Sequence, residues 1–327
     1  MNGYELVKKA IEFGSPERVP VVSVKFDPER DNCTIDYGTL GAGAKLWEPL
    51  RATQDEWGCV WNRTGLDNMG QVKEHPLSSR EAMKNYKFPD PDAGDRFANL
   101  ENILKDVAGK YVLLNLPFTL FERMHYLRGF TELLEDFYLY PEEVRGLAEK
   151  IVDFQIGVVN RLKDFKGRVH GVLMTDDWGT QSATIISLPL WREFFKPGYK
   201  RLFAAIHDMG MHTWLHSCGK VNDFINEFIE VGLDVINLGQ PALAGIAETG
   251  KKFAGRICFA SFVDVQTTFV RGTLDEIRAE AKLMIEKQGT PKGGFIGFDV
   301  DYECIGVAKE RRDAMISAFR EFGKLSC

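Results

Sequence analysis

Long apolar runs, runs of basic residues and paired cysteines are all missing from this sequence. No stretch approaches the ~20 apolar residues of a membrane-spanning helix, and the first residues lack the apolar core of a signal peptide. Lysine and arginine total 41 against 47 aspartate and glutamate residues, and the net charge of −6 argues against a general nucleic-acid partner. The six cysteines are scattered without a C-x-x-C motif. We therefore expect reduced thiols and a cytoplasmic protein.

A G-x-G-x-x-G motif is also missing after the first predicted strand, which disfavours a doubly wound dinucleotide-binding sheet. What is present is an alternation of strand and helix patterns. Strands are predicted at residues 19–26, 57–61, 111–116, 169–175, 211–216, 235–238, 257–262 and 294–298. The later strands are each followed by a helix, which indicates a parallel sheet.

Eight such units in 327 residues favour the α/β class and a (βα)8 (TIM) barrel, with a doubly wound sheet as the alternative. We expect residues 1–327 to form a single barrel domain. Residues 27–95 are predicted to be an elaborated N-terminal segment over one mouth of the barrel, with residues 27–52 irregular, because they hold too few apolar periodic stretches for a core of their own.

A His-x-Cys pair follows the predicted strand that starts at Met211. Residues two apart in a strand point the same way, so His216 and Cys218 should project side by side from the strand end, and Gly219 lets the chain turn away. Imidazole and thiolate together suit Zn²⁺. A core histidine beside a buried free thiol is the alternative interpretation.

In a (βα)8 barrel the active site lies at the carboxyl ends of the strands, and polar residues gather at these ends here. Asp176 and Gln240 are the predicted catalytic residues, with Asp176 preferred over its neighbour Asp177 because it lies closer to the strand. The predicted substrate-binding residues are Trp178, Asn115 and Glu122, although Trp178 could simply pack.

A third metal ligand must come from elsewhere in the chain. Cys304, after the last strand, is the best sulfur candidate, and the oxygen candidates in the same loop are Asp299, Asp301 and Glu303. The choice among these four stays open at this point.

Three segments together resemble the uroporphyrinogen decarboxylase superfamily. They are His216-Ser-Cys-Gly219, Asp176-Asp-Trp-Gly-Thr-Gln181, and Leu188-Pro-Leu-Trp-Arg-Glu-Phe-Phe-Lys-Pro197. The resemblance runs from about residue 19 to the C-terminus and implies a (βα)8 barrel. The decarboxylases use no metal and have an arginine-rich segment soon after the first strand, where this chain has a single arginine, Arg30. The corrinoid-dependent methyltransferases of the superfamily carry a His-x-Cys zinc pair, which His216 and Cys218 match.

The resemblance therefore implies a zinc-dependent methyltransferase. It would move a methyl group between a small O-, N- or S-methylated substrate, or a thiol, and a corrinoid such as methylcobalamin carried by a partner protein. In the methyltransferases a later cysteine follows the last strand closely, whereas Cys304 lies several residues further on. Two alternatives remain: a metal-free decarboxylase with Asp176 stabilising the intermediate, and a non-catalytic ligand-binding barrel.

Overall fold

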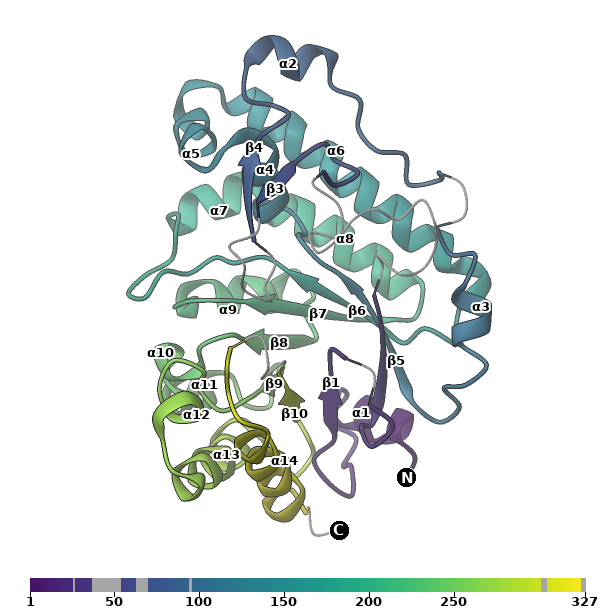
Figure 1. Cartoon of the computed structure of the whole chain (residues 1–327), viewed down its shortest axis with the longest axis vertical. Coiled ribbons are helices and arrows are strands. Elements are labelled where there is room, and N and C mark those ends of the chain that lie inside the picture. The colour runs from purple at the N-terminus through teal and green to yellow at the C-terminus, as the bar shows by residue number, and fades with distance from the viewer. Residues whose placement is uncertain (26, 37–53, 63–69, 94–95, 301–304, 325–327) are drawn as a thin grey trace.

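A computed structural model describes residues 1–25, 27–36, 54–62, 70–93, 96–300 and 305–324. Among these residues, eight strands form one parallel sheet that curls into a nearly closed barrel, in the order β1-β10-β9-β8-β7-β6-β5-β2 (Figure 1). The strands are β1 (Val21–Ser23), β2 (Asn32–Asp36), β5 (Tyr111–Leu116), β6 (Gly171–Thr175), β7 (His212–Ser217), β8 (Val235–Leu238), β9 (Cys258–Ser261) and β10 (Phe295–Asp299). The predicted α/β barrel is confirmed.

The second barrel strand differs from the prediction. It is β2, which pairs with β5 in parallel, so residues 27–52 are not irregular throughout as predicted. The predicted strand at residues 57–61 instead contributes to β3 (Val60–Asn62), which pairs antiparallel with β4 (Gln71–Glu74) in a separate two-stranded sheet. The described chain between β1 and β2 contains no helix, and the strand–helix alternation that revealed the later strands therefore gives no signal here.

The seam between β1 and β2 is closed by a side chain. The Asn32 side chain accepts a hydrogen bond from the Ser23 N–H (2.8 Å) and donates one to the Ser23 carbonyl (2.9 Å). The carboxylate of Asp31 accepts from the Val21 N–H at 2.8 Å. These contacts supply the partners that a neighbouring strand would otherwise give to β1, as buried backbone groups require.

Helices cover the outside of the barrel (Figure 1). They are α1 (Gly3–Ile11), α2 (Arg80–Asn85), α3 (Leu100–Ile103), α4 (Phe121–Arg128), α5 (Phe130–Leu139), α6 (Pro141–Asn160), α7 (Leu188–Phe194), α8 (Lys196–Asp208), α9 (Asn222–Glu230), α10 (Pro241–Ala244), α11 (Ile246–Phe253), α12 (Thr268–Arg271), α13 (Leu274–Gln288) and α14 (Lys309–Phe322), with a short 3-10 helix at Arg161–Phe165. Within the described ranges, no helix has the length and apolar character needed to cross a membrane.

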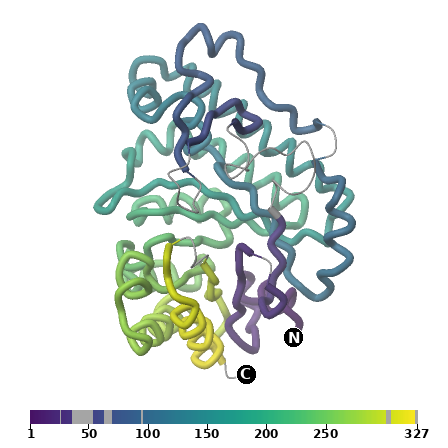
Figure 2. Tube along the Cα trace, viewed as in Figure 1, coloured from purple at the N-terminus to yellow at the C-terminus, as the bar shows by residue number. Residues whose placement is uncertain are grey.

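The first and last described segments of the chain lie together. Figure 2 shows the purple N-terminal segment beside the yellow α14, and the Val19 N–H donates to the Gly323 carbonyl at 2.8 Å. The last helix therefore packs against the start of the barrel, which joins the first and last βα units.

The register of the ladder decides which side chains face the barrel interior. It aligns His216 of β7 with Asn237 of β8, Ala260 of β9 and Ile296 of β10. Aligned residues of parallel strands share a face, and the residue after each lies on the other face. A Cβ placed on Gly297, which follows Ile296, would lie 2.6 Å from the Phe319 ring of α14, so that second face meets the helices. The His216 row therefore faces the interior.

Candidate metal centre at the barrel mouth

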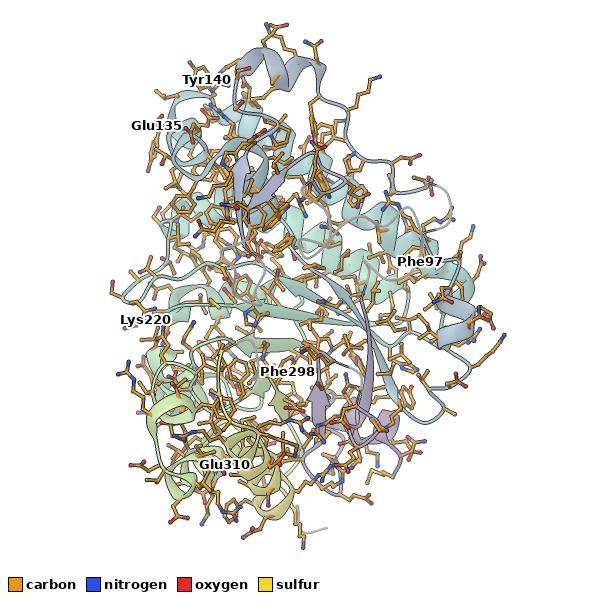
Figure 3. The ribbon with its side chains drawn as sticks, viewed as in Figure 1. Phe97, Glu135, Tyr140, Lys220, Phe298 and Glu310 are labelled. Carbon is orange, nitrogen blue, oxygen red and sulfur yellow. The ribbon has the colours of Figure 1, made fainter. Side chains whose placement is uncertain are left out.

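His216 and Cys218 lie side by side at the carboxyl end of β7, as predicted. The Nε2 atom of His216 is 3.4 Å from the Sγ atom of Cys218, and both side chains are half-buried. Lys220, two residues further on, is exposed and is labelled at the left edge of Figure 3. His216 and Cys218 therefore lie at the end of the barrel formed by the carboxyl ends of the strands, which is where (βα)8 barrels have their active sites.

Asn237 fixes the proton position on His216. The Nδ2 of Asn237 donates to the Ala260 carbonyl at 2.6 Å, and a carbonyl can only accept, so Oδ1 must be the amide atom that faces His216. Oδ1 lies 2.6 Å from His216 Nδ1 and accepts its hydrogen. The lone pair of a neutral imidazole is then on Nε2, the atom that faces Cys218. This outer hydrogen bond is typical of metal-binding histidines.

Asp177 adds a third possible metal ligand beside His216 and Cys218. The possible ligand atoms of the three residues all lie within 4.8 Å of one another. In the described part of the chain, this is the one group of three or more His, Cys, Asp or Glu residues with that geometry. The closest carboxylate oxygen is 4.0 Å from His216 Nε2, and it accepts a hydrogen bond from the Cys218 N–H at 2.7 Å. A carboxylate, an imidazole and a thiolate are all zinc ligands.

Asp176, the aspartate chosen from the sequence, points to the other face of β6. Its carboxylate is fully buried and accepts the backbone N–H groups of Leu120, Phe121 and Glu122 at the start of α4, together with the Tyr199 hydroxyl. An anion at a helix N-terminus satisfies unpaired N–H groups and the helix dipole. The structure therefore brings Asp177, not Asp176, to the histidine–cysteine pair, and Asp176 positions α4.

Glu122 reaches the mouth from α4. Its carboxylate accepts the Thr175 hydroxyl at 2.8 Å and lies 3.4 Å from the Tyr126 hydroxyl. Thr175 is aligned with His216 across the ladder, so both face the interior. Asn115 of β5 lies on the same face, half-buried and two residues deeper. The predicted substrate-binding roles of Glu122 and Asn115 stay predictions.

Gln240 lies beside the pair, and its Oε1 accepts the Gly219 N–H just after Cys218. Its predicted catalytic role stays a prediction. Gly219 has φ = +80°, and a Cβ on it would lie 2.1 Å from the Gly179 carbonyl carbon. Both facts require glycine at this turn, which confirms the sequence-based reason for Gly219.

Trp178 lies away from the mouth. It is fully buried, its ring stacks on Phe121 at a centroid distance of 4.7 Å, and its Nε1 donates to the Tyr199 hydroxyl at 3.1 Å. The substrate-binding role predicted for Trp178 stays a prediction, and the side chain itself is packed among the rings of Phe121 and Tyr199. Packing, the alternative interpretation, fits this position.

One oxygen candidate for the third ligand is engaged elsewhere. The Asp299 carboxylate is buried and binds two arginines, accepting from Nε of Arg30 at 2.9 Å and from Nε of Arg312 at 2.9 Å. This ion-pair network faces α14 rather than the barrel interior. The other three candidates, Asp301, Glu303 and Cys304, lie outside the described residues.

Negative charge accumulates at the pair. Burial acts to lower the pKa of His216, but the interaction with Cys218, the Asp177 carboxylate and the hydrogen bond to Asn237 raise it to about 10. Burial, followed by the charges of Asp177 and Asp176, raises the pKa of Glu122 well above its usual value. A site with this electrostatic character favours a bound cation.

The sequence analysis did not identify Asp177 as a possible metal ligand, and it gave Asn237 no role. The signal for both is the register that aligns β6, β7 and β8, since Asp177 lies two residues after Thr175 and Asn237 lies directly opposite His216. That register depends on which strands pair, and strand pairing is a tertiary property that the local sequence pattern does not contain.

The chain is similar in sequence to a known family and to two curated proteins. A family profile for uroporphyrinogen decarboxylase (URO-D) matches residues 66–298. A methylcobamide:CoM methyltransferase MtaA of Methanosarcina barkeri is 28% identical over 106 residues, which are 32% of this chain and 30% of that protein. The corresponding MtaA of M. barkeri strain Fusaro is 27% identical over the same length. The matched segment thus spans about a third of the curated relatives it resembles.

A solved structure shares the fold along almost the whole chain. A methyltransferase from Methanosarcina mazei superposes with a TM-score of 0.73 at 15% identity, covering 98% of this chain and 99% of that one. At this identity the similarity concerns the barrel architecture. Since the family profile covers more than two thirds of the sequence, the chain belongs to the uroporphyrinogen decarboxylase (URO-D) family.

Proposed function

We propose that this chain is a zinc-dependent methyltransferase that works with a corrinoid cofactor carried by a partner protein. The methyl group would move between a small methylated molecule, or a thiol, and the corrinoid. The observation that carries the proposal is the inward-facing pair of His216 Nε2 and Cys218 Sγ, 3.4 Å apart at the barrel mouth. The segments similar to two methylcobamide:CoM methyltransferases support the same reaction class.

The pair fits zinc in distance and in chemistry. With Zn–S near 2.3 Å and Zn–N near 2.0 Å, a tetrahedral ion separates sulfur from nitrogen by roughly 3.5 Å. The observed separation is 3.4 Å. When a metal ion displaces the proton on Nε2, the imidazole presents its lone pair there because Asn237 holds Nδ1–H, so the ring is already oriented for a metal.

A zinc ion bound there would supply Lewis acidity, which lowers the pKa of a coordinated thiol or polarises the heteroatom that carries the methyl group. The residues of this chain would hold and orient that ion. His216 and Cys218 bind it, Asn237 fixes the imidazole, and Gln240 holds the turn at Gly219. Burial raises the pKa of Glu122, which lies beside Thr175, and this favours the protonated form that can give a proton to a departing oxygen.

The structure gives less support to the two alternatives. A metal-free decarboxylase would use Asp176 at the mouth, yet this carboxylate is buried against α4. A closed structural zinc site needs four protein ligands, whereas the described residues bring three donors together. An open coordination position is what a catalytic metal requires.

The direct test is a methyl-transfer assay with free methylcobalamin in place of the partner protein. The purified chain is mixed with methylcobalamin and coenzyme M, and in parallel with reduced cobalamin and methoxylated aromatics, while the cobalamin spectrum is followed. We expect transfer in at least one direction, lost in His216→Ala and in Cys218→Ala and kept in Asp223→Asn, an exposed change on α9. Zinc-loaded protein that transfers no methyl group, or that converts uroporphyrinogen to a four-carboxylate product, would overturn the proposal.

A further inference from the structure

We propose that Asp177 is the third protein ligand of the metal, so that the centre carries one carboxylate, one imidazole and one thiolate. This inference rests on the proposed function, because it concerns the zinc ion proposed there. It replaces the two-sulfur site that a contribution from Cys304 would give.

The backbone places Asp177 next to Cys218. The β6–β7 ladder aligns Thr175 with His216, and one further ladder bond runs from the Asp176 N–H to the His216 carbonyl (3.0 Å). The pairing then shifts by one residue, because the Cys218 carbonyl accepts from the Gly179 N–H (3.0 Å) where a regular ladder would use Trp178. At this irregularity the Cys218 N–H donates to an Asp177 carboxylate oxygen at 2.7 Å, and the possible ligand atoms of Asp177, His216 and Cys218 lie within 4.8 Å of one another.

The loop after β6, which contains Asp177, and the loop after β7, which contains Cys218, are in close backbone contact. A Cβ on Gly179 would lie 2.4 Å from the Lys220 nitrogen, and a Cβ on Gly219 would lie 2.1 Å from the Gly179 carbonyl carbon. Backbones this close leave no room for side chains between them. The Lys220 N–H also donates to the Thr180 carbonyl at 2.8 Å. Backbone contacts thus fix the positions of the two loops relative to each other.

The carboxylate is held in position and has room to adjust. One oxygen of Asp177 accepts the Cys218 N–H at 2.7 Å and lies 4.0 Å from His216 Nε2. In a tetrahedral zinc site this oxygen–nitrogen distance is roughly 3.4 Å, so a small rotation completes the geometry. The side chain is 41% exposed, which permits that rotation. Its neighbour Asp176 has no such freedom, being buried under α4.

The ligand set has a consequence for charge. A carboxylate and a thiolate together carry two negative charges, which balance a divalent ion, while the neutral imidazole adds none. Three protein ligands leave one of the four tetrahedral positions for substrate, as in catalytic zinc sites.

X-ray absorption at the zinc edge of the wild-type protein tests this assignment without any variant. We expect one sulfur at about 2.3 Å and the remaining neighbours to be nitrogen or oxygen at about 2.0–2.2 Å. Two sulfur neighbours would overturn the assignment of Asp177 while leaving the zinc-dependent function standing. Protein that holds no zinc at all would instead remove the proposed function, and the inference with it.

Zinc affinity, measured by competition with a chromophoric chelator, gives a second readout. We expect Asp177→Asn to weaken binding by more than the roughly 10–100-fold that loss of an outer hydrogen-bond partner costs. Cys304→Ser and the matched surface change Asp223→Asn should leave the affinity unchanged. A large loss in Cys304→Ser with none in Asp177→Asn would contradict the inference.

Discussion

At the scale of single residues, the orientation of one imidazole decides whether a metal can bind. Asn237 determines that orientation, because its own amide is fixed by the Ala260 carbonyl. We predict that Asn237→Ala weakens zinc binding by roughly 10–100-fold, since the ring can then rotate or change tautomer. Chelator competition measures this. Asn222→Ala is the control, because its amide also donates to a backbone carbonyl but contacts neither ligand; an equal loss there would refute the argument.

Gly239 makes room for the thiolate. A Cβ at this position would lie 2.7 Å from Cys218 Sγ and 3.2 Å from His216 Cε1. Gly239→Ala should therefore displace the sulfur, lower the zinc content and cost about 1–3 kcal/mol of stability through overpacking. Gly146→Ala is the matched control, because nothing lies within 4 Å of that site on α6. It should keep its zinc and gain about 0.5–1 kcal/mol. Full zinc occupancy in Gly239→Ala would speak against the close contact.

The parts of the site that depend on a pattern within one strand can be predicted from sequence, and the parts that depend on the pairing of strands cannot. His216 and Cys218 could be placed together from sequence because the period of two within a strand is local. The choice between Asp176 and Asp177 could not, since it depends on which face of β6 is turned inward, and β6 itself is an almost continuously buried, apolar strand without polar alternation. The register with β7 decides that choice.

At the scale of elements, one ion pair joins the last turn of α8 to the residue that precedes β8. His207 Nε2 lies 2.8 Å from an Asp234 oxygen that also accepts the Thr213 N–H and hydroxyl. The bond to Asp234 raises the pKa of His207. Burial acts to raise the pKa of Asp234, but His207 and the Thr213 N–H lower it.

The signs of these shifts define a pH window. A raised histidine pKa gives stability that is complete below the unfolded value of about 6.5 and is lost as pH rises through the folded value. A lowered aspartate pKa gives stability that is complete above about 3.9 and is lost at more acidic pH. The pair therefore stabilises the fold most between about pH 4 and 6.5.

We predict that the stability difference between the wild type and His207→Gln is larger at about pH 5.5 than at about pH 9. Urea unfolding at both values measures it. A difference that stays constant or grows toward alkaline pH would show that charge on His207 contributes nothing. This pair also illustrates a contact that no local pattern predicts, because 27 residues separate its two members.

Among the barrel strands, β5 to β10 could be predicted from sequence because each is a short apolar run followed by an amphipathic helix. β2 could not, because polar Asn32, Thr34 and Asp36 alternate along it and the described residues between β1 and β2 contain no helix. Aromatic residues instead favoured the segment at residues 57–61, whose Trp57 and Trp61 rings pack with Phe154 and with Phe118 outside the barrel sheet. Aromatic burial there reflects packing against helices rather than a barrel strand.

At the scale of the whole molecule, the barrel depends on the seam between its first two strands. Asn32 is 2% exposed and bridges both backbone groups of Ser23. Asn32→Ala removes these bonds and leaves the buried Ser23 N–H without a partner, so we expect a loss of about 2–4 kcal/mol in the free energy of unfolding. Asn102→Ala, an exposed change on α3, should stay within about 0.5 kcal/mol. Equal stability of the two variants in urea would mean that the seam is closed by other contacts.

The central claim concerns the molecule as a whole: a parallel barrel that gathers His216 and Cys218 at its mouth to hold a catalytic zinc ion. Metal analysis of protein purified without chelator tests it most directly. We predict about one zinc ion per chain in the wild type and none in the folded His216→Ala/Cys218→Ala double variant, since Asp177, the one proposed ligand that remains, cannot hold the ion alone. A wild-type chain free of zinc, or a double variant that keeps its zinc, would contradict the account.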